Sequence, residues 1–177
     1  MNHLLLIPVL LPLLCGALLM LVPREAIRAA RMYSLLSVVG LLVCAAYLVV
    51  QANQAQIQVY SLGNWSAPFG IVLLLDRLSA LMLLVTAVLS VCVTLYAVRG
   101  DDQRGGYFHT LLQFQIAGIN GAFLTGDLFN LFVFFEILLI ASYALLLHGL
   151  GTARIRAALH YVILNLIGSG LFLVAAG

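Results

Sequence analysis

Residues 128–147 read LFNLFVFFEILLIASYALLL, and this stretch decides the fold class of the chain. A helix rises about 1.5 Å per residue, so a segment of this length crosses a hydrocarbon core about 30 Å thick. One charge interrupts it: Glu136, which follows Asp127 by nine residues and therefore lies about 13 Å deep. A carboxylate at mid-membrane costs about 2.5–3.5 kcal/mol on insertion scales, so it normally faces a bundle interior or a wet cavity. An acid at this depth suggests that a proton or a cation moves through the protein.

The composition of the whole chain is typical of a membrane protein. Of its 177 residues, 64% are hydrophobic and 8% are charged, and the mean hydropathy is +1.17. Soluble domains carry about 25% charged residues, so we predict a polytopic membrane protein with the lipid bilayer as its main partner. A net charge of +2 gives no indication of a nucleic-acid partner.

The sequence predicts neither a metal site nor a cofactor. Cys15, Cys44 and Cys92 lie within apolar runs and have no metal-ligand spacing. Such cysteines are typically small buried hydrophobic residues and not parts of a disulfide framework. No nucleotide-binding glycine pattern is present either. We therefore do not expect redox chemistry or an enzyme active site in this chain.

Six apolar stretches of about 20 residues divide the chain, which predicts an all-α membrane protein with about six transmembrane helices. In the longest loop, residues 51–70, an alternating pattern at Gln56–Val59 predicts a short strand. The predicted spans are residues 4–22, 32–50, 78–98, 108–124, 128–147 and 157–176.

The arginines predict how these spans are oriented. Seven of the eight basic residues lie in alternate loops, and Arg77 alone lies on the opposite side. The positive-inside rule makes the arginine-rich side cytoplasmic, so we expect the N-terminus outside a cell inner (plasma) membrane. The seven residues are Arg24, Arg28, Arg31, Arg99, Arg104, Arg154 and Arg156.

Polar residues within the spans are the candidates for a proton path. His109, Gln113 and Asn120 fall within about 40° of one another on the fourth helix. They either line a hydrated path or make hydrogen bonds between helices, with Asn120 the more structural member. Tyr143 shares the face of Glu136, where it either bonds a relay partner or packs as an aromatic. His160 is either a proton relay or an interfacial residue of the sixth helix.

The remaining charged candidates lie at helix ends. Asp127 begins the fifth helix, where a carboxylate is favoured as an N-cap, and we expect a cap rather than a proton carrier. Asp76 and Arg77 begin the third helix and are expected to form an interfacial ion pair. For Glu136 two interpretations stay open, a neutral hydrogen-bonded acid without further function or a member of an ion pathway.

Three stretches resemble the D subunit of Mrp-type multi-subunit monovalent cation/proton antiporters. They are NWSAPFGIVLLLDRLSALMLL at residues 64–84, GINGAFLTGDLFNLFVFFEILLIASYALLLHG at residues 118–149, and ALHYVILNLIGSGLFL at residues 158–173. Such subunits are related to the antiporter-like membrane subunits of respiratory complex I and of membrane-bound hydrogenases. The resemblance implies that Glu136 is the fifth-helix glutamate that these subunits use in proton transfer.

The same resemblance implies that only part of a family member is present. The family pairs its fifth-helix glutamate with a lysine on a seventh helix, and this chain contains no lysine. We expect the first part of a larger antiporter-like subunit. Residues 1–107 would form an N-terminal three-helix segment, and residues 108–177 the first three helices, four to six, of a truncated proton-channel repeat.

The predicted function is that of a membrane subunit in a sodium/proton antiporter, working with other subunits and translocating protons through Glu136. One alternative is a proton-pumping membrane subunit of an NADH-quinone oxidoreductase-like or hydrogenase complex. Another is an inactive fragment that acts only as a membrane scaffold.

Overall fold

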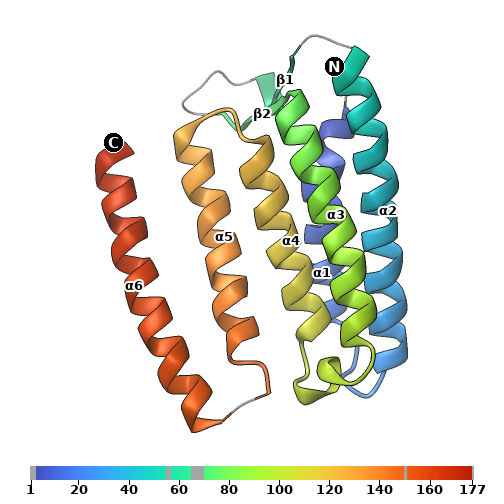
Figure 1. Cartoon of the computed structure of the whole chain (residues 1–177), viewed down its shortest axis with the longest axis vertical. Helices are drawn as coiled ribbons and strands as arrows, with labels where there is room; N and C mark the ends of the chain where they lie inside the picture. The colour runs from blue at the N-terminus through green and yellow to red at the C-terminus, as the bar shows by residue number, and fades with distance from the viewer. Residues whose placement is uncertain (1–2, 55–56, 65–69, 150, 177) are drawn as a thin grey trace.

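The computed structural model describes residues 3–54, 57–64, 70–149 and 151–176. Within these residues six long helices lie side by side, with a small two-stranded sheet at one end (Figure 1). Apart from that sheet, the predicted all-α membrane fold is confirmed. The helices are α1 (Ile7–Met20), α2 (Ile27–Gln54), α3 (Arg77–Ala97), α4 (Phe108–Leu124), α5 (Leu128–Leu146) and α6 (Thr152–Ala176).

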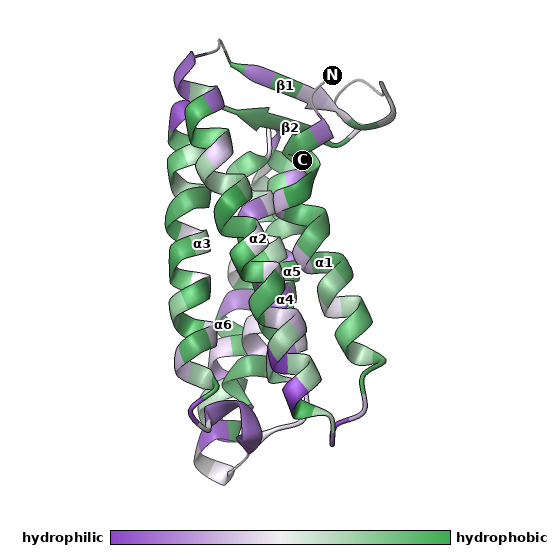
Figure 2. Ribbon diagram, turned by 90° about the vertical axis from the view of Figure 1, so that its right-hand side faces the viewer, coloured by the Kyte–Doolittle hydropathy of each residue, from purple (hydrophilic) through white to green (hydrophobic). Residues whose placement is uncertain are grey.

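Five segments of the described chain are long and apolar enough to cross a membrane, and α4, with 17 residues, is shorter. Figure 2 shows hydrophobic residues along most of the length of the helices. The helix α2 is longer than predicted, because the arginines before residue 32 and the glutamines after residue 50 are good helix formers that extend it beyond its apolar part. The five segments are His3–Met20, Ile27–Gln54, Arg77–Ala97, Leu128–Leu146 and Arg154–Ala175.

The helix α4 lies at the centre of the bundle, where it contacts α1, α3 and α5. It approaches α5 closely because two glycines face that helix. A Cβ added at Gly118 would lie 2.7 Å from the backbone nitrogen of Leu138, and one at Gly121 would overlap the ring of Phe134. By contrast, α6 lies at the edge of the row beside α5 (Figure 1), and Ala158 is its one buried side chain among those described.

The sheet covers one end of the bundle. Its strands β1 (Gln58–Ser61) and β2 (Val72–Leu75) are antiparallel, and β1 overlaps the predicted strand, whose first residue, Gln56, lies outside the described residues. Leu73 and Leu75 of β2 are buried, and Leu73 pairs with Thr125 in the turn between α4 and α5. The sheet therefore holds that turn at the same end as His3, which bonds Tyr60 of β1 at 2.9 Å.

The opposite end carries the loops rich in arginine (Figure 1). A 3₁₀ helix, η3 (Asp101–Arg104), lies between α3 and α4 at this end. Two further short 3₁₀ helices, η1 (His3–Leu6) and η2 (Leu62–Asn64), lie at the end with the sheet.

Candidate functional site

Glu136 lies in the middle of α5 and is half-buried. Its Oε1 atom is buried and has no hydrogen-bond partner among the residues described. A buried oxygen of this kind is costly in an apolar environment, so it normally marks a place where water, an ion or another chain completes the site. This is the depth and burial expected of a carboxyl group that exchanges protons.

Two aromatic pairs show that Glu136 faces α6. Phe132 stacks on Phe172 with ring centroids 6.3 Å apart, and Tyr143 meets Tyr161 edge-on at 5.6 Å. Glu136 lies between Phe132 and Tyr143 and within about 40° of both around the α5 axis. The carboxyl group therefore belongs to the contact between α5 and α6, which we call the α5–α6 seam.

Tyr143 is the predicted relay candidate that lies on the same seam as Glu136. Its phenol group is within electrostatic reach of Glu136 and lies beside the amide of Asn165 from α6. The hydroxyl of Tyr161 lies 3.5 Å from Ser142 Oγ on the same seam. The α5–α6 seam thus collects polar groups from both helices in an otherwise apolar contact.

Two of the three candidate residues of α4, Gln113 and Asn120, face away from this seam and bond α2 and α1. Gln113 Nε2 donates to the Ser34 hydroxyl at 3.2 Å, and its Oε1 accepts from Ser37 at 3.1 Å. Asn120 Nδ2 donates to the carbonyl of Pro8 at 2.8 Å. That carbonyl has no partner within α1, because the residue four positions later is Pro12, which has no N–H.

Gln113 and Asn120 therefore make the hydrogen bonds between helices that were one of their two predicted roles, and His109 bonds Asp102 of η3. They do not extend to Glu136, because the glycine face of α4 separates them from α5. The prediction that His109, Gln113 and Asn120 share one face of the helix agrees with these contacts.

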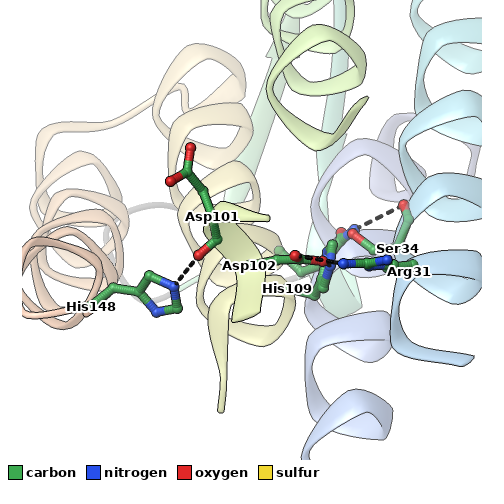
Figure 3. Close-up of polar contacts among 7 residues, drawn as sticks. Arg31, Ser34, Asp101, Asp102, His109 and His148 are labelled. Carbon is green, nitrogen blue, oxygen red and sulfur yellow. Dashed lines mark hydrogen bonds and ion pairs between the residues drawn. The ribbon is translucent and has the colours of Figure 1, made fainter. Parts of the chain in front are cut away.

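His109 belongs to a buried charged cluster that the sequence analysis missed (Figure 3). Asp102 of η3 is completely buried and receives two bonds from Arg31 of α2, at 2.6 and 2.8 Å. His109 Nε2 lies 3.1 Å from the same carboxylate. The signal was present in the sequence, as Asp101 and Asp102 are adjacent acids within an arginine-rich loop.

Charge and hydrogen bonding keep Asp102 ionised. Burial alone would raise the pKa of Asp102, but the hydrogen bonds from Arg31 and His109 outweigh it and hold the pKa below its ordinary value of 3.8. A cavity of about 20 Å³ adjoins Asp102 and His109, and His109 Nδ1 is buried without a partner among the described residues. This cavity is large enough for one water molecule.

The two aspartates at helix starts are both N-caps. Asp127 Oδ1 accepts from the backbone N–H of Asn130 at 2.7 Å, which is the cap geometry expected for it. Asp76 differs from its prediction: its carboxylate accepts from the N–H of Ser79 at 2.6 Å, and the Ser79 hydroxyl accepts from the Asp76 N–H at 2.9 Å. This reciprocal cap lowers the pKa of Asp76, chiefly through the Ser79 backbone bond.

The prediction of an ion pair between Asp76 and Arg77 is wrong, because the described residues contain no such pair. The reason is geometric. An N-cap side chain folds back over the first turn to meet free N–H groups, which directs it away from its immediate neighbour.

His160 is exposed, and its Nδ1 lies 2.9 Å from the carbonyl oxygen of Arg156, one turn earlier in α6. Among the described residues it has no link to Glu136. The same residues contain no group of three or more histidine, cysteine or acidic side chains that could hold a metal ion.

Comparison with known proteins confirms the resemblance seen in the sequence. Over 98% of this chain, identity is 48% to the D subunit of a "Probable K(+)/H(+) antiporter" of Rhizobium meliloti and 42% to the D subunit of a Na(+)/H(+) antiporter of Alkalihalophilus pseudofirmus. The chain spans about a third of the length of these relatives, 33% and 36%. No protein-family model matches.

Solved structures agree with the sequence relatives. A chain of the Mrp complex from Dietzia sp. DQ12-45-1b superposes with a TM-score of 0.91 at 30% identity, covering 98% of this chain and 34% of that one. A chain of the membrane-bound sulfane sulfur reductase, an archaeal respiratory membrane complex, gives a TM-score of 0.80 at 28% identity, covering 97% and 35%. The similarity therefore includes antiporter and respiratory complexes, as the predicted relationship implies.

Proposed function

We propose that this chain, similar over nearly its whole length to D subunits of Mrp-type antiporters, forms the first part of such a subunit and transfers protons through Glu136. The observation that carries the proposal is the Glu136 carboxyl at the centre of α5, with a buried oxygen that has no partner among the described residues. It is an acid in a stretch that otherwise has every property of a lipid-compatible helix.

The mechanism would couple proton binding to the movement of positive charge. A cation that approaches Glu136 favours the carboxylate, and its withdrawal favours proton uptake. In the related subunits a lysine on a seventh helix is the expected cation. The eight basic residues of this chain are all arginines, which lie in loops or in the first two turns of a helix, so we infer that the partner comes from further sequence or another subunit.

The arrangement proposed for the whole protein follows from this. Residues 1–107 would precede residues 108–177, which would be helices four to six of the proton-channel repeat, in a multi-pass protein of the plasma membrane. The partners would be other subunits of the complex, and the coupled ion would be a monovalent cation. We propose Na⁺ as the coupled cation; the names of the relatives include both Na⁺ and K⁺.

A second candidate is a proton-translocating membrane subunit of a respiratory complex, which the likeness to the sulfane sulfur reductase favours. Its redox centres would lie on other chains. Purification of the native complex distinguishes the two, because a respiratory complex carries peripheral subunits with visible redox spectra and an antiporter does not.

The proposal is tested by replacing Glu136 in the full-length subunit within its complex. Glu136→Gln keeps the size and polarity of the side chain but cannot titrate, so it should assemble normally and lose cation-driven proton movement. Glu136→Asp should keep reduced activity, because the carboxyl group is withdrawn by about one methylene.

The measurement is cation-driven proton movement in inverted vesicles, normalised to the amount of assembled complex. If Glu136→Gln transports at nearly the wild-type rate, Glu136 is a structural acid and the proposal is wrong. Na⁺, K⁺ and Li⁺ compared in the same vesicles identify the coupled cation.

A further inference from the structure

A second buried polar group faces Glu136 across the α5–α6 seam. Asn165 of α6 is half-buried; its Nδ2 atom is buried and makes no hydrogen bond of normal geometry among the described residues, and its amide lies within reach of the Tyr143 phenol. The unpaired atom of Glu136 is an acceptor, and that of Asn165 is a donor. The described residues contain five unpaired buried side-chain atoms, and those of Glu136 and Asn165 are the two that lie on this seam, one an acceptor and one a donor.

The aromatic pairs determine how the two helices are aligned. Phe132 opposite Phe172 and Tyr143 opposite Tyr161 obey one antiparallel register. In that register Glu136 is level with Gly168, and Asn165 lies one turn away, about 4.5 Å along the axis. Around α6, Asn165 and Gly168 point in the same direction as the two aromatic residues to within about 40°.

Gly168 leaves room beside the carboxyl group. A Cβ added at this position would have no atom within 4 Å. Gly170 is open in the same way, but it lies about 160° from Gly168 around the helix and so on the opposite face of α6. The two glycines leave opposite sides of the helix bare, and in the register set by the aromatic pairs Gly168 is the one that is level with Glu136.

We infer that Asn165 and Gly168 of α6 form a receiving site for the Glu136 carboxyl group: Gly168 leaves the space, and Asn165 donates a hydrogen bond to the carboxylate, directly or through one water. Tyr143 borders the site from α5. Asn165 is thus a positioning residue that favours the ionised form of Glu136. This inference rests on the proposed function only for its effect on transport, because the contact itself can be measured separately.

The charged and titratable surroundings of Glu136 are few. Among the described residues, Tyr143 of α5 and Tyr161 of α6 are the titratable groups on the seam. The helix α4 packs on the other side of α5, and its titratable side chain is His109. His109 lies at the end of α4 near η3, where it is bound to Asp102. A change in the ionisation of Glu136 after substitution of Asn165 can therefore be assigned to the lost donor.

The experiment compares matched variants in the full-length subunit within its complex. Asn165→Leu removes the donor, and Asn165→Gln keeps an amide. Gly168→Leu fills the space beside Glu136, and Gly170→Leu is its control, with the same change on the opposite face.

The first readout is infrared difference spectroscopy across a pH titration, in which the carboxyl band of Glu136 is identified by its loss in Glu136→Gln. Losing a hydrogen bond to the carboxylate should move the midpoint of that band upward by about one pH unit in Asn165→Leu, with most of the shift reversed in Asn165→Gln. The second readout is transport, which should fall about tenfold or more in Gly168→Leu, because it displaces the carboxyl group.

The inference is wrong if Asn165→Leu leaves the infrared midpoint unchanged, or if Gly168→Leu and Gly170→Leu have the same midpoint and transport rate. The proposed function fails by a different result, normal transport in Glu136→Gln. In that case the shifted midpoint in Asn165→Leu would still establish the contact.

Discussion

Asp102 is a completely buried acid that is held ionised by Arg31 and His109, and it joins α2 and α4 to the loop between α3 and α4. Asp102→Asn should cost about 3 kcal/mol of stability, because breaking a buried ion pair leaves the guanidinium without its counter-charge. Denaturant titration of the purified protein in detergent measures this loss. Asp101→Asn is the control, since Asp101 is 36% exposed and its pair with Arg104 is a surface contact expected to contribute less than about 1 kcal/mol. Equal losses in the two variants would contradict this account of Asp102.

Asp102 also predicts how stability depends on pH. Its pKa is lower in the folded state than the ordinary 3.8, so its contribution is fully present above that value and is lost as pH falls through the lowered pKa. The wild type should therefore lose stability more steeply below about pH 4 than Asp102→Asn does. Thermal melting at a series of pH values from neutral to about pH 2 measures the two slopes. Parallel slopes would show that another group controls acid unfolding.

Asp127 is expected to act through the first turn of α5 and not through proton transfer. Asp127→Asn should be mild, because asparagine caps a helix about as well as aspartate does. Asp127→Ala should cost about 0.5–2 kcal/mol and reduce the amount of folded protein, which quantitative immunoblotting of membranes reports. Loss of transport in a fully assembled Asp127→Asn complex would instead make Asp127 a proton carrier.

At the scale of helices, the contact between α4 and α5 depends on two glycines. At Gly118 an added methyl group would meet the backbone of Leu138, which cannot move without shifting α5. We expect Gly118→Ala to destabilise the protein by about 1–3 kcal/mol, the usual cost of overpacking. Gly170→Ala is the matched control on α6, where the added methyl group meets no atom within 4 Å and should be neutral or slightly stabilising. Thermal melting of the two variants measures the difference, and equal melting temperatures would argue against close packing of α4 on α5.

The helix α6 differs from the others in how it is held. Its contacts with α5 include two aromatic pairs and the hydroxyls of Ser142 and Tyr161, and most of its described surface is exposed. A seam with few packed atoms can separate more easily than the close α4–α5 contact. This arrangement places the carboxyl group of Glu136 between a closely packed helix and a loosely packed one.

For the whole molecule, the arginines predict an external N-terminus. Seven arginines belong to the end opposite the sheet, and Arg77 belongs to the end with the sheet. We expect the loops that carry residues 24–31, 99–104 and 154–156 to face the cytoplasm. Single cysteines in a variant without Cys15, Cys44 and Cys92, treated with an impermeant thiol reagent on intact cells, decide the orientation. Labelling of these loops from outside would reverse it.

The properties that depend on local composition could be predicted from the sequence. Apolar stretches of the right length predicted all six helices, because every backbone group in a bilayer must be bonded within its own segment. The start of α5 at Asp127 could also be predicted, since a cap acts on the turn that follows it. Glu136 stood out because one charge in an apolar helix is visible without any knowledge of its neighbours.

Which side chains meet depends on how the helices pack, and the sequence pattern does not show it. Asp102 lies 71 residues from Arg31 in the chain, and Asn120 lies 112 residues from Pro8. The spacing of Pro8 and Pro12 shows that the Pro8 carbonyl lacks its usual partner in the helix, but it does not show that Asn120 bonds it. The sequence also did not show that Asp76 caps its helix and does not pair with Arg77, because this depends on the direction of the side chain over the first turn. Hydropathy predicts that a helix lies in the bilayer, but the pairing of helices depends on the shapes of their faces. For Glu136, the pairing of α5 with α6 places Asn165 and Gly168 on the opposite side of the seam.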